Sequence, residues 1–79
     1  MSICEKLQLA IDVIKKCDLE KDVLNVVIAH TDKVEILINN ENTLLQFGKG
    51  VKTVNHKGKM FNSKSSIIVD GVKIYSYHN

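Results

Sequence analysis

Apolar side chains recur every three or four positions over the first 17 residues, which is the spacing of one face of an α-helix. The repeating residues are Ile3, Leu7, Ala10, Ile14 and Cys17, with Cys4, Ile11 and Val13 on the flanks. Ser2 and Glu5 form a Ser-x-x-Glu pattern, in which each side chain accepts a hydrogen bond from the other residue's backbone N–H at a helix start. We therefore expect an amphipathic helix over about residues 2–17, with this apolar stripe in the protein core rather than against a partner helix.

Two β-branched segments follow and predict a hairpin over about residues 23–39. Residues 23–29 are apolar at almost every position. Both faces of this strand are therefore expected to be covered, which favours a central place in the sheet. In the second segment Val34, Ile36 and Ile38 alternate with other residues, although Leu37 interrupts the alternation. This second strand is expected to have one covered face.

A short second helix is expected near residues 41–47. The asparagines before it can cap its start, and Leu44, Leu45 and Phe47 supply an apolar side. Gly48 suits the left-handed backbone conformation that ends many helices.

The remainder of the chain reads as short strands over about residues 51–56, 59–63, 66–69 and 72–77, with a break at Lys64. Asp70-Gly71 lies between two valines and is a strong hairpin signal, because a two-residue turn needs positive φ at both positions. Ile67 is expected opposite Ile74. The other face of this hairpin is expected to be mixed and partly hydrated, with Ile68 and Ser66 beside Lys73, Tyr75 and Tyr77.

These elements predict an α+β fold in which the N-terminal helix packs on an antiparallel sheet of four to six strands. The 79 residues are expected to form a single domain, residues 1–79, because a chain of this length cannot bury two cores. The helix can cover one sheet face. The other face has too few apolar residues to be buried unless strands curl or two chains meet, so homodimer formation is a further expectation.

Charge is divided unevenly along the sequence. Residues 1–41 hold eight acidic residues and five lysines, net −3, whereas residues 42–79 hold six lysines and one acidic residue, net +5, which sums to the overall +2. A partner is therefore expected at the local lysine cluster, since the global charge is weak. The expected partner-binding residues are Lys49, Lys52, Lys57, Lys59, Lys64, Tyr75 and Tyr77.

Three explanations of this cluster remain open. Another protein is the favoured partner, because tyrosine is common at interfaces and a basic rim can meet an acidic patch. A sequence-tolerant nucleic-acid binder is the alternative, with lysines on phosphates and aromatic rings stacked on bases. The chain has no arginine, which excludes the bidentate base contacts that arginine makes. Lysines at strand ends and turns also keep sheet edges solvated without any partner.

No residue pattern indicates an enzyme, a metal site or a cofactor. Cys4 and Cys17 are about 20 Å apart along the expected helix, too far for a disulfide. The three histidines lack metal-ligand spacing; they are His30, His56 and His78. A Ser–His or Cys–His nucleophile would need the fold to bring distant residues together.

Two further patterns point away from special roles. The segment Gly48-Lys49-Gly50 precedes a strand-like segment and not a helix, so it is interpreted as a helix stop and not as a phosphate cradle. No apolar run reaches the roughly 18–20 residues of a membrane span, and the N-terminus lacks the pattern of a secretory signal. We therefore expect a cytoplasmic protein.

Parts of the chain resemble small, mostly uncharacterised proteins carried by phages and prophages of low-GC bacteria. The matching residues are Leu44, Leu45, Phe47 and the run 67–75 around the Asp-Gly turn. The resemblance covers about half of the chain, and none of the shared motifs is catalytic. It implies a viral accessory protein that docks on a host enzyme or defence complex and inhibits or modulates it, with no functional residue carried over.

Overall fold

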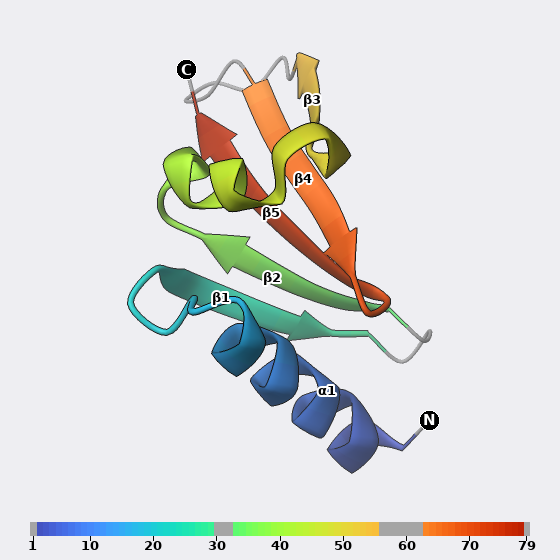
Figure 1. The fold of residues 1–79 in the computed structure, drawn as a ribbon. Helices are drawn as coiled ribbons and strands as arrows, with labels where there is room; N and C mark the ends of the chain where they lie inside the picture. The colour runs from blue at the N-terminus through green and yellow to red at the C-terminus, as the bar shows by residue number, and fades with distance from the viewer. Residues whose placement is uncertain (1, 30–32, 56–62, 79) are drawn as a thin grey trace.

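The computed structural model describes residues 2–29, 33–55 and 63–78 (Figure 1). In chain order the elements are α1 (Ile3–Lys16), β1 (Val23–Ile28), β2 (Val34–Ile38), the 3-10 helix η1 (Glu41–Gly50), β3 (Lys52–Asn55), β4 (Ser63–Val69) and β5 (Val72–His78). The strands form one five-stranded sheet in the order β1-β2-β5-β4-β3. The expected α+β fold is confirmed, as is the expected number of strands.

The sheet is mixed, so the prediction of a purely antiparallel sheet was wrong at its centre. β2 and β5 pair in parallel, with Val34 opposite Val72 and Ile36 opposite Ile74, whereas the other three strand pairs are antiparallel. Local turns predict the β1–β2 hairpin and the β4–β5 hairpin separately. A parallel pair needs a long crossover connection, here residues 39–71, and local sequence patterns do not indicate where such a crossover returns.

β1 lies at an edge of the sheet, so its expected central position was also wrong. Leu24 is 62% exposed and Val27 is 39% exposed. β2 and β5 are central instead. β5 pairs with the side of β2 that β1 does not occupy. β2 therefore becomes a central strand, and β1 stays at the edge although its apolar sequence had suggested a central place.

The N-terminal helix forms as expected, but the face that it buries is rotated about the helix axis relative to the predicted face. The capping box is present: Ser2 N–H donates to Glu5 Oε1 (3.1 Å), and Glu5 N–H donates to Ser2 Oγ (3.2 Å). The buried residues on α1 and at its end are Lys6, Ala10, Val13 and Cys17. The predicted core stripe with its flanks was therefore wrong for four of its members, since Cys4 is exposed and the exposed fractions of Ile3, Leu7 and Ile11 are 63%, 46% and 43%.

Lys6 explains much of this rotation. Its side chain is 5% exposed, and its Nζ atom donates a hydrogen bond to the backbone oxygen of Ala29 (2.9 Å). A lysine stem of four methylene groups can pack on apolar surface while its ammonium group finds a polar partner. Ala10, with its small side chain, lets the helix lie close to the sheet. A hydrophobicity pattern counts Lys6 as polar and therefore misplaces the buried face.

The turns that depend on glycine agree with expectation, and two element bounds do not. Asp70 (φ 51°) and Gly71 (φ 82°) form the β4–β5 turn, with Ile67 opposite Ile74 as expected. Gly48 has positive φ (60°) and non-helical backbone angles, so it interrupts the helix where a stop was expected, and a further short turn after this kink extends η1 to Gly50. Lys64 lies inside β4, so the expected strand break there was wrong, and the expected strand over 59–63 falls almost entirely outside the described residues.

Both helices pack on the same face of the sheet (Figure 1). α1 lies across β1, β2 and β5, while η1 lies across β4 and β5. The buried core between these layers consists of Ala10, Val13, Cys17, Leu19, Val34, Ile36, Ile38, Leu44, Val72 and Ile74. The opposite face of the sheet has no described helix over it.

Candidate functional site

The sheet face opposite the helices, called the open face from here on, is built from alternating residues of all five strands. The strand register places on this face Asn25, Val27, Glu35, Leu37, Lys52, Val54, Lys64, Ser66, Ile68, Lys73, Tyr75 and Tyr77. Leu24 joins them because the register shift between Val23 and Asn25 is a β-bulge, and Leu24 lines a hollow of about 140 Å³ together with Leu37 and Tyr77. The open face is therefore a mixed apolar and basic surface.

Two tyrosines and a lysine form the centre of the open face. The rings of Tyr75 and Tyr77 meet edge to face, with centroids 5.7 Å apart and an interplanar angle of 87°. The Nζ atom of Lys64 lies 4.5 Å from the Tyr75 centroid and 5.6 Å from the Tyr77 centroid. The Nζ atom of Lys73, which lies two residues before Tyr75 on β5, is 5.9 Å from the Tyr75 centroid. A cation over an aromatic face is attracted by the negative charge of that face, so these contacts hold both ammonium groups close to the rings.

Tyr75 is almost fully covered within this cluster. Its exposed fraction is 9%, and burial raises the pKa of its hydroxyl, with smaller contributions of the same sign from Tyr77 and Glu35. The neutral phenol is therefore the form that the fold stabilises. The ring of Tyr75 serves as a platform beneath Lys64 and Lys73 and is too covered to stack on a ligand of its own.

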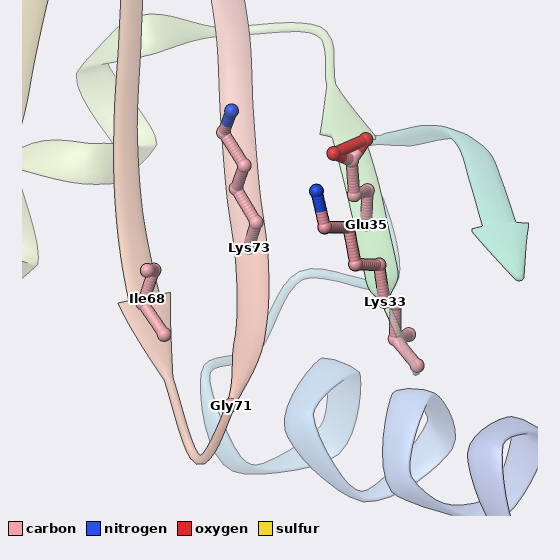
Figure 2. Close-up of a pocket in the computed structure, with 6 residues that line it drawn as sticks. Lys33, Glu35, Ile68, Gly71 and Lys73 are labelled. Carbon is pink, nitrogen blue, oxygen red and sulfur yellow. The ribbon is translucent and has the colours of Figure 1, made fainter. Parts of the chain in front are cut away.

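Ile68 projects between two hollows on the open face. One hollow of about 270 Å³ is lined by Lys33, Val34, Glu35, Ile68, Gly71 and Lys73 (Figure 2). The other, of about 460 Å³, is lined by Gly50, Lys52, Ser66, Ile67, Ile68 and Lys73. Ile68 is 70% exposed and Val54, on β3, is 63% exposed. Large apolar side chains in water at the rims of hollows are typical of surfaces that bind other proteins.

The described part of the open face is positively charged. It carries four lysines, Lys33, Lys52, Lys64 and Lys73, and its described acidic residue is Glu35. Figure 2 shows Lys33 and Glu35 extending along β2 beside Lys73 on β5. The salt bridge found among the described residues joins Lys16 to Asp70 at the β4–β5 turn. None of the four lysines of the open face forms a salt bridge with a described carboxylate.

The fold brings together four of the seven expected partner-binding residues: Lys52, Lys64, Tyr75 and Tyr77. The backbone of Lys49 lies in η1, and Lys57 and Lys59 lie outside the described residues.

Sequence reasoning placed Ile68 and Lys73 on the same hairpin face as Tyr75 and Tyr77, and the register confirms this, but it did not include them, or Lys33, among the partner-binding residues. Lys73 was recognisable, because it alternates with Tyr75 and Tyr77 along one strand. Lys33 belongs to the acidic half of the sequence, and it reaches the open face only through the parallel pairing of β2 with β5.

A second polar group lies on the helix side of the sheet. Ser65 Oγ is 2.7 Å from His78 Nε2 and 2.9 Å from Thr53 Oγ1. The fold has thus united a serine with a histidine that is distant in sequence. Ser65 is 5% exposed, and its hydroxyl is already engaged by two partners, so this geometry is that of an internal hydrogen-bond network and not of an accessible nucleophile.

Within residues 2–29, 33–55 and 63–78, no three His, Cys, Asp or Glu side chains are grouped as they would be around a metal ion. The helices in these ranges are too short and too polar to cross a membrane. Comparison with family models, with curated proteins and with solved structures finds no match to this chain.

Proposed function

We propose that this protein is a small non-enzymatic binding module that docks through its open face onto an acidic surface of another protein. The observation that carries the proposal is the arrangement of Lys64 and Lys73 over Tyr75 beside the exposed side chain of Ile68. Apolar contact area and unpaired positive charge lie on the same rigid sheet face.

Such docking would depend on the apolar area and the positive charge of the open face acting together. Ile68 and Val54 offer apolar area that water solvates poorly, and its burial contributes about 25 cal/mol per Å². The lysines around them favour a negatively charged partner and increase the rate of encounter with it. The β-sheet holds the side chains in place before binding, so little conformational entropy is lost on docking.

The resemblance to phage and prophage proteins suggests a class of partner. A host enzyme or defence complex with an acidic substrate-binding or subunit-binding surface fits the charge of the open face, and occupation of that surface would inhibit the partner by exclusion. We propose this mode of action for the protein.

A sequence-tolerant nucleic-acid binder is the second candidate, and the unpaired lysines favour it. Four lysines on one face could contact phosphates. Stacking on bases is less well supported, because Tyr75 is 9% exposed and Lys64 lies over both tyrosine rings. Binding of this kind would weaken by roughly 0.7 to 0.9 log units per log unit of salt for each phosphate contacted.

The two candidates are separated by affinity capture with charge-reversed variants. The Lys52→Glu/Lys73→Glu variant changes the open face, and the Lys15→Glu/Lys21→Glu variant carries the same change in charge on the α1 side, where both lysines are exposed. Extracts of the source organism are treated with nuclease before capture. The proposal predicts a protein that is retained by the wild type and the α1-side variant and lost with the open-face variant. Loss of all capture after nuclease treatment, together with steep salt dependence of binding to DNA or RNA, would establish the second candidate instead.

A further inference from the structure

β1 is an edge strand that lacks the charged residues and prolines that normally protect an edge. Its sequence, VLNVVI, holds no charged residue and no proline, whereas β3 at the other edge begins with Lys52. Exposed edges are usually blunted by charges, prolines or bulges, because their free backbone groups pair readily with another strand. β1 has a bulge at Leu24, but residues 26–28 continue in regular register.

The free hydrogen-bonding groups of this edge can be assigned. Ala29 N–H donates to the backbone oxygen of Lys33 (3.1 Å), so residues of that parity, including Val27, direct their backbone groups toward β2. Val26 and Ile28 therefore direct their N–H and C=O groups away from the sheet. These two residues can form four hydrogen bonds with an antiparallel strand of the same sequence.

An apolar ridge on α1 faces the same direction as this edge. The ridge consists of the exposed residues Ile3, Leu7 and Ile11 and the half-buried Ile14. Lys16, on the opposite flank of the helix at 100° per residue, bonds Asp70 in the β4–β5 turn (3.0 Å). The ridge therefore points away from the centre of the sheet, past β1, and Figure 1 shows α1 lying along the β1 end of the sheet.

A two-fold axis that paired two copies of β1 would also bring together two copies of the helix ridge. The bond between Lys6 Nζ and Ala29 O joins the first turns of α1 to the C-terminal end of β1. Val27 lies two residues further along β1, about 6.6 Å, which corresponds to about four residues of helix. Val27 thus lies nearer the middle of α1, in the region of the ridge residues Leu7 and Ile11. A two-fold axis between two paired Val27 residues would therefore also run between the two ridges.

We infer that β1 and the α1 ridge form a homodimer interface, in which β1 of one copy pairs antiparallel with β1 of the other about Val27. Val26 of each copy then bonds Ile28 of the other, and the two helices lie side by side and antiparallel on the same face. A second copy is the occupant that fits, because both surfaces are apolar, uncharged and complementary to themselves about the same axis. The two sheets become one, and the two open faces become a continuous surface. The interface does not involve the docking residues, so it stands or falls independently of the proposed function.

A disulfide at the axis tests this geometry. Residues opposite each other in a non-hydrogen-bonded antiparallel pair have Cα atoms about 4.5 Å apart, within the range of about 4.4–6.8 Å that a disulfide spans. In a Cys4→Ser background, Val27→Cys is expected to form a linked dimer under mild oxidation. The matched control is Val54→Cys, which places a more exposed thiol on the other edge strand, and it is expected to remain unlinked.

Solution mass provides the second readout. The wild type is expected to sediment at twice the 8.9 kDa chain mass, and Leu7→Asp/Ile11→Asp is expected to shift to the monomer mass with an unchanged circular dichroism spectrum. Leu45→Asp, at a position that is 73% exposed on η1, should leave the dimer intact. A monomeric wild type at millimolar concentration, or linkage of Val54→Cys as readily as Val27→Cys, would overturn the inference. If the aspartate variant does not fold, the cysteine pair still decides, because it leaves the ridge unchanged.

Discussion

The Nζ atom of Lys64 lies 4.5 Å from the centroid of the Tyr75 ring, across two antiparallel strands and on the sheet face opposite the helices. This contact orders a lysine that would otherwise move freely in solvent, and it covers a tyrosine that would otherwise be exposed. The same pair fixes both the charge and the shape of the surface to which we assign docking.

Replacement of Lys64 by Met tests the energetic role of this pair. Methionine keeps an apolar stem over the ring and removes the cation, so the free energy of unfolding should fall by about 0.5–1 kcal/mol, the usual size of a cation–π contact. Urea denaturation followed by tyrosine fluorescence measures the change. Lys52→Met is the control, since Lys52 is exposed and lies over neither ring, and it should leave stability unchanged. Equal losses in both variants would remove the basis for a special Lys64–Tyr75 contact.

Ser65 and Ser76 are neighbours across β4 and β5, yet they are predicted to respond in opposite ways to replacement by alanine. Ser65→Ala breaks the contacts to Thr53 and His78 and should cost about 1–3 kcal/mol. Ser76 Oγ is fully buried and has no hydrogen-bond partner among the described residues. Ser76→Ala should therefore be neutral or stabilising. Chemical denaturation of both variants decides, and a strongly destabilised Ser76→Ala would show that this hydroxyl is bonded after all.

The capping box at the start of α1 makes stability depend on acidic pH. Hydrogen bonds from the backbone and side chain of Ser2 lower the pKa of Glu5 below its ordinary value of 4.5. Because the folded-state pKa lies below the unfolded one, the stabilisation is present above pH 4.5 and is lost as the pH falls through the folded-state pKa. NMR titration of Glu5 should give a lowered pKa in the wild type and a less strongly lowered one in Ser2→Ala, which keeps the backbone N–H of residue 2 but removes the hydroxyl group. The same midpoint in both proteins would contradict the capping account.

The Asp70-Gly71 turn should be sensitive to backbone conformation and not to side-chain volume. A Cβ atom at Gly71 would meet nothing within 4 Å, but φ there is +82°. Gly71→Ala should cost about 1–2 kcal/mol, because an L-residue resists positive φ. Gly71→Asn should cost less, since asparagine tolerates that region. Thermal unfolding of the two variants measures the difference, and equal stability of both would mean that φ is not the cause.

Local signals in the sequence predicted those elements that local physics determines. The Ser2 and Glu5 pair gave the start of α1, and the Asp70-Gly71 pair gave the last hairpin and its register. In each of these, residues close in sequence satisfy each other's backbone requirements, so no knowledge of the remaining chain is needed.

The parts that were missed depend on contacts between distant segments. The parallel pairing of β2 with β5 is set by a 33-residue crossover, residues 39–71, and it moved β1 to the edge. The rotation of α1 follows from Lys6 reaching Ala29, 23 residues away. The lysine-rich half of the sequence indicated only part of the basic surface, because Lys33 joins it from the other half through the fold.

Site-specific photocrosslinking tests the central claim, docking through the open face, most directly. A photoreactive phenylalanine derivative is placed at Ile68 on the open face or at Leu45 on η1, two positions of nearly equal exposure (70% and 73%). Each protein is irradiated in nuclease-treated extract of the source organism, and adducts are resolved by mass. We predict a discrete protein adduct from position 68 and none from position 45. Adducts of equal yield from both positions, or from position 45 alone, would contradict docking through the open face.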